Sequence, residues 1–386
     1  ESQGGKMNFT LTEQQEMIRR TVRDIAQKVV APRAAEMDRT GEYPWDIKEI
    51  LARQGLLGLL IPEEYDGVGA DLLTACLVIE ELAKVDGSTA CIVVGAVDGV
   101  FTMLIAANED QKKRYFPHLA SGAMGGAIAI TEPGAGSDVS AMSTRAVRDG
   151  DYYRLSGVKH FITMGGGISE LFTVFAITDP SKGARGISTF IVEKDYRGFK
   201  IGKHEDKMGM RAVPNVEIIM EDVLVPANNL LGKEGDGFKL VMQALDRARP
   251  GVAAQSVGLA QGALDYAIEY SKNRVQFGQP IGEFQGIQFM LADMATQVEA
   301  ARYLTYRAAI AIQEGAKEGP KLAAMAKLLA SDTAMRVTTD AVQVLGGYGY
   351  MKDYPVERMM RDAKLMQLFV GTNQIQRLIV GRALLA

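Results

Sequence analysis

Long segments with helical periodicity fill the C-terminal part of the chain, and they limit the possible folds more than any other feature. Apolar residues recur at intervals of three and four positions through 238–273, 284–314, 320–345 and 356–385. Helices of this number and length are typical of a four-helix bundle. We therefore predict such a bundle within residues 233–386.

Two other textures precede the bundle. Residues 7–122 again show helical periodicity, as in EQQEMIRRTVRDIAQKVV, after a start that Leu11 and Thr12 suggest is capped. Between 123 and 232, short β-branched runs such as LFTVFAIT and GISTFIVEK are separated by turn residues. The sequence predicts a multi-domain α+β protein, with an N-terminal helical domain (7–122), a β-barrel-like middle domain (123–232) and the C-terminal bundle (233–386).

The composition indicates an ordinary globular protein. Of 386 residues, 47% are hydrophobic and 23% are charged, and the net charge of −4 gives no basic surface suited to nucleic acid. Cys76 and Cys91 lie in apolar runs and the histidines are scattered, so we expect no metal site. The residues before Met7 contain no apolar run of signal-peptide length, and we expect a cytoplasmic location.

Residues 88–107 form an apolar run that approaches the length of a membrane span. Two internal glycines and Asp98 favour a buried core helix instead, because a central carboxylate is costly in lipid. We therefore expect no membrane partner. Asp98 is the only charged residue between Asp86 and Glu109. Since burying an unpaired carboxylate is expensive, Asp98 is either a structural acid with hydrogen bonds, or a helix break, or a functional group.

Five strings carry a resemblance to a known family: AITEPGAGSDVS at 129–140, GVKHFITMGG at 157–166, RVQFGQPIGEFQ at 274–285, QVLGGYGY at 343–350 and RMMRDAKLMQLFVGTNQIQR at 358–377. Together with the domain order, they resemble the acyl-CoA dehydrogenase family over essentially the whole chain. The resemblance implies FAD as cofactor, an acyl-CoA thioester as substrate, an electron-transferring flavoprotein as electron acceptor and a homotetramer. The chain has no glycine-rich nucleotide motif of the Rossmann or P-loop type.

By this resemblance, two groups of residues bind FAD. The flavin ring is assigned to Ile130, Thr131, Phe161 and Thr163, with Phe161 standing where Trp is commoner. The pyrophosphate and adenosine half, belonging to the FAD of a neighbouring subunit, is assigned to Arg274, Phe277, Gln285, Gln343, Gly346 and Gly347, and the set is completed by Thr372 and Gln374. A guanidinium suits a pyrophosphate, and glycine lets backbone approach a ligand closely. The CoA ester is assigned to Ser137, Asp246 and Arg249.

The catalytic base that the family pattern calls for is absent from its usual position. Most family members carry a glutamate just before the glycine of the last string, where this chain has Val370. Val370 can still donate its backbone amide to the thioester carbonyl. A minority of members place the carboxylate on the helix that contains ALDRARP, where this chain has Ala248. Alignment with the string ANEDQKKRY places Asp98 on the helix that lines the acyl pocket, and it becomes the candidate base.

A base in a different place implies a different proton. An α,β-unsaturated thioester has no α-proton, and its acidic proton lies on the γ-carbon. We therefore expect a 1,4-elimination on cyclohex-1-ene-1-carboxyl-CoA, and the base pattern is similar to that of family members that act on this compound in anaerobic metabolism of alicyclic and aromatic acids. Two alternatives stay open: a conventional 1,2-acyl-CoA dehydrogenase, for example for cyclohexanecarboxyl-CoA, and a non-catalytic protein that binds FAD and acyl-CoA.

Overall fold

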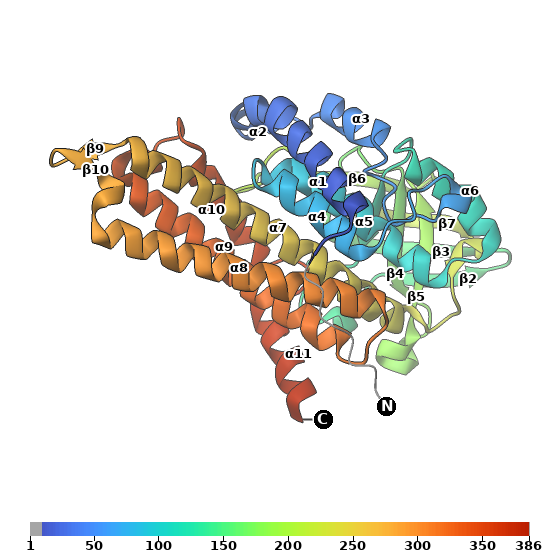
Figure 1. Ribbon diagram of the computed structural model, residues 1–386. Coiled ribbons are helices and arrows are strands. Elements are labelled where there is room, and N and C mark those ends of the chain that lie inside the picture. The colour runs from blue at the N-terminus through green and yellow to red at the C-terminus, as the bar shows by residue number, and fades with distance from the viewer. Residues whose placement is uncertain (1–9, 386) are drawn as a thin grey trace.

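The computed structural model describes residues 10–385, and it consists of a helical N-terminal part, a central sheet and a C-terminal bundle. Figure 1 shows the sheet at one end of the molecule and the far end of the bundle at the other. The expected α+β architecture is confirmed. The predicted domain limits at 122 and 232 fall between consecutive elements, in the connections 121–125 and 232–236.

The N-terminal part contains the helices α1 (Glu13–Ile25), α2 (Ala34–Thr40), α3 (Trp45–Arg53), α4 (Leu72–Ala83), α5 (Gly87–Ala106) and α6 (Glu109–Ala120). The start of α1 has the expected cap, because the Thr12 hydroxyl accepts from the Gln15 amide at 3.2 Å and the Gln15 side chain accepts from the Thr12 amide at 3.0 Å. Asp86 caps α5 in the same way, by accepting from the Thr89 amide at 2.7 Å.

Helix α5 is the apolar run that contains Asp98. It is the one helix within residues 10–385 that is long and apolar enough to cross a membrane, and 67% of its most apolar window is buried inside the protein. It packs against the helix α7 (Gly237–Asn273) and against the strands β1 (Gly126–Ala129) and β4 (Leu171–Ile177). The expectation of a core helix agrees with this burial, and the helix carries Asp98 into the junction of the three parts.

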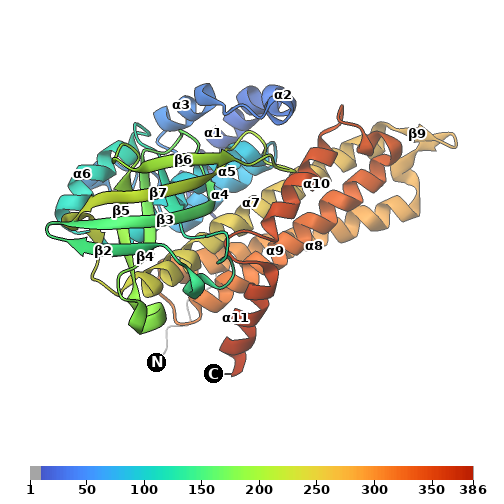
Figure 2. The same ribbon diagram turned by 180° about the vertical axis from the view of Figure 1, so that it is seen from behind.

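The middle part forms one eight-stranded sheet in the order β6-β7-β3-β2-β4-β5-β8, with β1 paired to β4 in parallel. The further strands are β2 (Arg145–Asp149), β3 (Tyr152–Thr163), β5 (Ile187–Glu193), β6 (Phe199–His204), β7 (Asn215–Pro226) and β8 (Leu230–Leu231). Almost every residue of β4 and β5 is buried, as their continuous apolar runs predict. Figures 1 and 2, which show opposite sides, place α4 and α5 on one side of this sheet.

The C-terminal part contains the helices α7 (Gly237–Asn273), α8 (Gln285–Gln313), α9 (Gly319–Leu345), α10 (Pro355–Met366) and α11 (Asn373–Leu385), and a short hairpin, β9 (Val275–Gln276) and β10 (Gln279–Pro280). The prediction of one final helix over 356–385 is wrong, because residues 367–372 interrupt it. Val370 and Gly371 there adopt positive φ angles of 53° and 87°, which no α-helix accommodates. Figure 2 shows α11 leaving the bundle as a separate arm.

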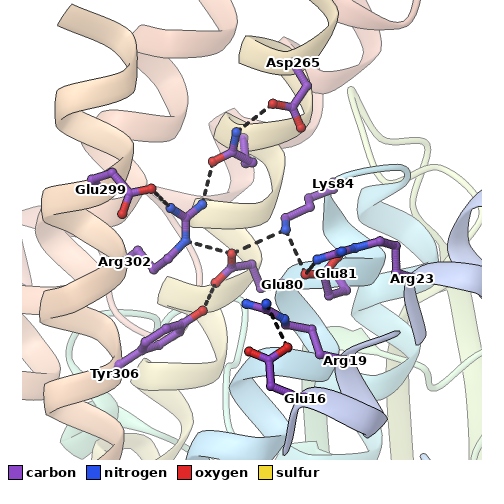
Figure 3. A network of polar contacts seen from close by, with 11 residues as sticks. Glu16, Arg19, Arg23, Glu80, Glu81, Lys84, Asp265, Glu299, Arg302 and Tyr306 are labelled. Carbon is purple, nitrogen blue, oxygen red and sulfur yellow. Dashed lines mark hydrogen bonds and ion pairs between the residues drawn. The ribbon is translucent and has the colours of Figure 1, made fainter. Parts of the chain in front are cut away.

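A buried polar network joins the N-terminal helices to the bundle (Figure 3). Glu80 of α4 accepts from the Arg302 guanidinium at 2.9 Å and from the Tyr306 hydroxyl at 2.7 Å, both on α8. Glu81 accepts from Arg23 of α1 at 2.9 Å and from Lys84 at 2.9 Å. Because both carboxylates are 3% exposed, their charges depend on these partners for compensation in the protein interior. The network therefore fixes α4, and the hydrophobic core around it, relative to α8.

Candidate active site

The connection between α10 and α11 presents a free backbone donor. Within residues 10–385, the Val370 amide donates no hydrogen bond. Val370 also has a φ of 53°, which is rare for a β-branched residue and indicates strain. A strained residue with an unused amide is the arrangement expected of a donor that waits for a ligand oxygen.

The two positions where the family places its base both belong to the large apolar core that joins the N-terminal helices to α7 and α10. Val370 and Phe369 pack against a core cluster that includes Val94 and Val97 of α5 and Ala248 of α7. Ala248 is buried and Val370 is half-buried. No carboxylate is available at either position to take a proton.

Asp98 stands on α5 between residues of that same cluster, one position after Val97 and one turn after Val94. Its Oδ1 atom is buried and has no hydrogen-bond partner among the described residues. Burial raises the pKa of Asp98 well above its usual range. The expectation of a hydrogen-bonded structural acid therefore finds no support at Oδ1, and a helix break is wrong, because α5 continues to Ala106.

Helix α7 carries a buried ion pair beside Ala248. The Arg249 guanidinium donates to the Asp246 carboxylate, and burial lowers the pKa of Arg249 and raises that of Asp246. Both residues were assigned to the CoA ester by resemblance. Burial and, after it, the charge of Arg249 lower the pKa of Lys327 on α9. Lys327 is a buried residue that sequence reasoning missed. Its only sequence signal is a lysine within the apolar run LAAMAKLLA.

The residues assigned to the flavin ring are brought together at the C-terminal end of β3. The Thr131 carbonyl accepts from the His160 amide at 2.8 Å, and Asn215 donates to both the Phe161 carbonyl and the Thr163 hydroxyl at 3.1 Å. The Phe161 ring is 59% exposed, although its backbone is held at a φ of 58°. The His160 ring stacks on the Phe161 ring, with 4.1 Å between the two ring centroids. An exposed aromatic face on a constrained backbone suits a planar ligand.

A buried ion pair supports this group of residues from behind. Lys159 donates to Glu132 at 2.8 Å and to the Ile130 carbonyl at 3.1 Å, and Glu132 also accepts from the Ser143 and Thr144 amides at 2.6 and 3.0 Å. Although burial opposes ionisation, Lys159 and these donors lower the pKa of Glu132 to about 2. The network fixes the backbone next to Thr131, and sequence reasoning did not foresee it.

A second group of assigned residues lies at the far end of the bundle, around a groove of about 440 Å³. The groove is lined by Arg274, Gly346 and Gly347, with the Arg274 guanidinium over the Tyr348 ring at 5.1 Å. A Cβ atom at either glycine would meet no atom within 4 Å, so the space above them is open to a ligand.

The remaining assigned residues are placed as follows. At the far end of the bundle, Phe277 is 95% exposed on the β9–β10 connection, and Gln285 and Gln343 are also exposed. At the start of α11, the Thr372 hydroxyl accepts from the Ile375 amide at 3.3 Å and Gln374 is exposed. Ser137 is exposed in the turn after β1.

The two halves of the assigned cofactor site are separate in this chain. The ring group lies in the connection after β1 and at the C-terminal end of β3, whereas the groove is next to the β9–β10 hairpin, which forms the far end of the bundle in Figure 1. One chain therefore does not bring all the assigned residues around a single ligand. This separation is what a cofactor shared between neighbouring chains requires. No cluster of metal-ligating side chains occurs in the described part of the chain, residues 10–385.

Comparison with known families identifies the class of this protein. Residues 12–123 match the acyl-CoA dehydrogenase N-terminal domain, residues 127–223 the middle domain and residues 235–385 the C-terminal domain. The chain belongs to the acyl-CoA dehydrogenase family. It is therefore an FAD-dependent oxidoreductase that acts on CH–CH groups, and the exposed Phe161 face and the glycine-lined groove fit that cofactor.

Two similar proteins from different bacteria bear the same name. The cyclohex-1-ene-1-carbonyl-CoA dehydrogenase of Syntrophus aciditrophicus is 49% identical over 97% of this chain and 91% of the relative. That of Geobacter metallireducens is 50% identical over 97% of this chain and 99% of the relative. An acyl-CoA dehydrogenase of Bacillus subtilis is 48% identical over 97% and 99%. Identity alone therefore does not decide the substrate.

Solved structures share the fold. Butyryl-CoA dehydrogenase from Megasphaera elsdenii matches with a TM-score of 0.96 at 46% identity, covering 98% of this chain and all of the other. A chain from a study of the electron transferring flavoprotein of Acidaminococcus fermentans matches with a TM-score of 0.96 at 49% identity and the same coverage. An acyl-CoA dehydrogenase complexed with FAD from Bacillus anthracis matches with a TM-score of 0.91 at 33% identity, covering 97% and 67%.

Proposed function

We propose that this enzyme converts cyclohex-1-ene-1-carboxyl-CoA to cyclohexa-1,5-diene-1-carboxyl-CoA by a 1,4-elimination. One observation carries the proposal: the positions that supply the base elsewhere in the family are Val370 and Ala248, while Asp98, a half-buried residue next to Val97 of the same apolar core, has a buried Oδ1 atom without a hydrogen-bond partner among residues 10–385. The two relatives named for this substrate support it. Such a reaction belongs to anaerobic degradation of alicyclic and aromatic acids.

The chemistry explains why both usual positions are apolar. The α-carbon of the substrate is sp2 and carries no proton, so a carboxylate at position 370 or 248 would have nothing to remove. Asp98 takes the acidic proton of ring carbon 3, and the C1–C2 double bond moves to C2–C3. A second double bond forms between C1 and C6 as hydride leaves carbon 6. FAD, when bound, accepts that hydride.

The protein stabilises the charge that develops during this step. The Val370 amide donates to the thioester oxygen, on which negative charge accumulates as the proton leaves. Burial raises the pKa of Asp98, which makes its carboxylate a stronger base than a surface aspartate. Because only the deprotonated form accepts a proton, we expect turnover to rise with pH through the raised pKa.

The separated half-sites support a homo-oligomer, for which we propose the tetramer that the family resemblance implies. Arg274, Gly346 and Gly347 of one chain would hold the pyrophosphate and adenosine half of the FAD whose ring lies at Thr131, Phe161 and Thr163 of a neighbour. We also propose an electron-transferring flavoprotein as the electron acceptor and the cytoplasm as the location.

The deciding experiment is anaerobic flavin bleaching with a panel of CoA thioesters. We expect cyclohex-1-ene-1-carboxyl-CoA to bleach the flavin and yield the 1,5-diene. Asp98→Asn should lower the bleaching rate at least about 100-fold at unchanged FAD content, and Asp179→Asn, at a half-exposed aspartate outside the candidate site, should leave it unchanged.

The two other functions predict different outcomes. A conventional 1,2-dehydrogenase would be bleached by cyclohexanecarboxyl-CoA in preference to the enoyl ester. A non-catalytic protein would bind these esters, bleach with none of them, and show no effect of Asp98→Asn. Either result would refute the proposal.

A further inference from the structure

The backbone conformation of Val370 needs an external restraint. Strained residues of this kind persist only where the surrounding structure over-determines them. Two residues hold the carbonyls on the C-terminal side of the Val370 amide. Lys327 on α9 donates to the Gly371 carbonyl at 2.8 Å, and Gln376 on α11 donates to the Val370 and Gly371 carbonyls at 3.2 and 2.9 Å.

Lys327 also anchors the start of α11. Its Nζ donates to the Asn373 side-chain oxygen at 3.0 Å, and the Asn373 amide donates back to the Gln367 carbonyl at 3.0 Å. The Asp332 carboxylate on α9 accepts from the side chains of Asn373 and Gln367, both at 2.7 Å. Segment 367–373 is thereby closed on itself and bound to α9 at both ends.

Lys327 has no exposed surface, and no carboxylate lies within ion-pair distance of its ammonium group in residues 10–385. Its two acceptors are a backbone carbonyl and an amide oxygen, both in segment 367–373. A buried lysine directed at a loop instead of at an acid is costly for stability alone. This cost is understandable if the loop has to be held in one geometry.

We propose that Lys327 is a positioning residue, which holds segment 367–373 so that the Val370 amide points at the thioester carbonyl of the substrate. Lys327 does not touch the substrate and acts through Gly371 and Asn373. The assignment rests on the proposed function, in which the Val370 amide receives the thioester oxygen.

The test uses the FAD-loaded enzyme and 4-(dimethylamino)cinnamoyl-CoA, a chromophoric thioester whose absorption moves to the red when its carbonyl is polarised. The parent should shift the probe to the red on binding. Lys327→Met, which keeps the length of the side chain and removes its donors, should lose at least half of this shift. It should also lower kcat at least about 10-fold with KM within about 3-fold, a smaller loss than the 10²–10³ for deleting an oxyanion donor.

Arg336→Gln is the matched control. Arg336 lies on α9 like Lys327, is exposed, and pairs with Asp340 at 3.8 Å, outside the hydrogen bonds that hold segment 367–373. Its red shift and kcat should equal those of the parent. If Lys327→Met fails to fold with FAD, Lys327→Gln, which keeps two donors on a shorter arm, is measured instead and should show an intermediate shift.

The outcomes separate the two ideas. If the parent and the Lys327 variant shift the absorption of the bound probe equally, the positioning role of Lys327 is overturned and the proposed function stays intact. A parent that binds the probe without a red shift overturns the proposed role of the Val370 amide, and the role of Lys327 with it.

Discussion

Replacing Asp98 by asparagine should make the protein more stable while it makes the enzyme slower. The Oδ1 atom of Asp98 is buried without a partner in the described structure, and burial raises the pKa of this carboxyl well above its usual range. A purely structural side chain at this position would not need an ionisable carboxyl group. A catalytic base does need one, and burying it lowers the free energy of unfolding.

The pH dependence follows from the sign of the shift. The folded protein binds the Asp98 proton more tightly than the unfolded chain does. The resulting stabilisation is therefore fully present below the unfolded pKa of about 3.9 and is lost as pH rises towards the raised folded pKa. Within that window the free energy of unfolding falls by about 1.4 kcal/mol for each pH unit. Asparagine does not titrate, so the variant's advantage over the parent should grow at the same rate.

Urea unfolding of the two proteins, at equal concentration and with excess FAD, measures this difference between about pH 4 and pH 8. Asp179→Asn is the control: its neighbours, first Lys182, lower the pKa of Asp179 to about 2, so the difference from the parent should stay flat above pH 5. A flat difference for Asp98→Asn as well would refute a buried carboxyl with a raised pKa. Increased stability with unchanged turnover would refute its role as base.

Three further predictions concern other parts of the site. Val370→Glu should create some 1,2-dehydrogenation of cyclohexanecarboxyl-CoA that increases with assay pH, because an apolar pocket raises the pKa of the new carboxylate; a variant that binds FAD and this ester and has no activity at any pH would contradict our account of the valine. Arg274→Ala should release FAD faster on dilution, because a charge-assisted contact is lost, and an unchanged release rate would exclude it from the cofactor site. Glu132→Gln should cost about 3–5 kcal/mol of unfolding free energy at neutral pH, because it leaves Lys159 buried and unpaired. The contribution of this pair is present above the usual carboxyl pKa and is lost as pH falls through about 2, and a loss below 1 kcal/mol in urea unfolding would contradict it.

The helices were predictable because their apolar periodicity is a local property of the chain. The interruption of the last predicted helix was not, because the apolar spacing runs through LMQLFV and on into α11. The loop is fixed in part by a hydrogen bond from Lys327 and by hydrogen bonds that Asp332 accepts from it, and both residues lie some forty positions earlier in the chain. A pattern read along the chain does not contain them.

The candidate site shows the same division. Asp98 could be found because a lone charge in an apolar run is visible in the sequence, and Val370 because the residue before Gly371 departs from a motif. The residues that support the ring group could not be found in this way. His160 lies in β3, Glu205 follows β6 and Asn215 begins β7, and the three come together only in the folded sheet. Polar partners far apart in sequence carry no periodic signal.

The separation of the two cofactor half-sites within one chain has a genetic consequence. If FAD spans two chains, a variant that is inactivated in the groove and a variant that is inactivated in the ring group should each be inactive alone. Together in one oligomer, they should restore activity. When the two variants associate, one FAD site combines the intact ring group of one chain with the intact groove of the other and is functional. The second FAD site combines the two damaged parts and stays inactive. Co-expression of Arg274→Ala with a variant of Phe161 would then recover activity that neither parent strain possesses.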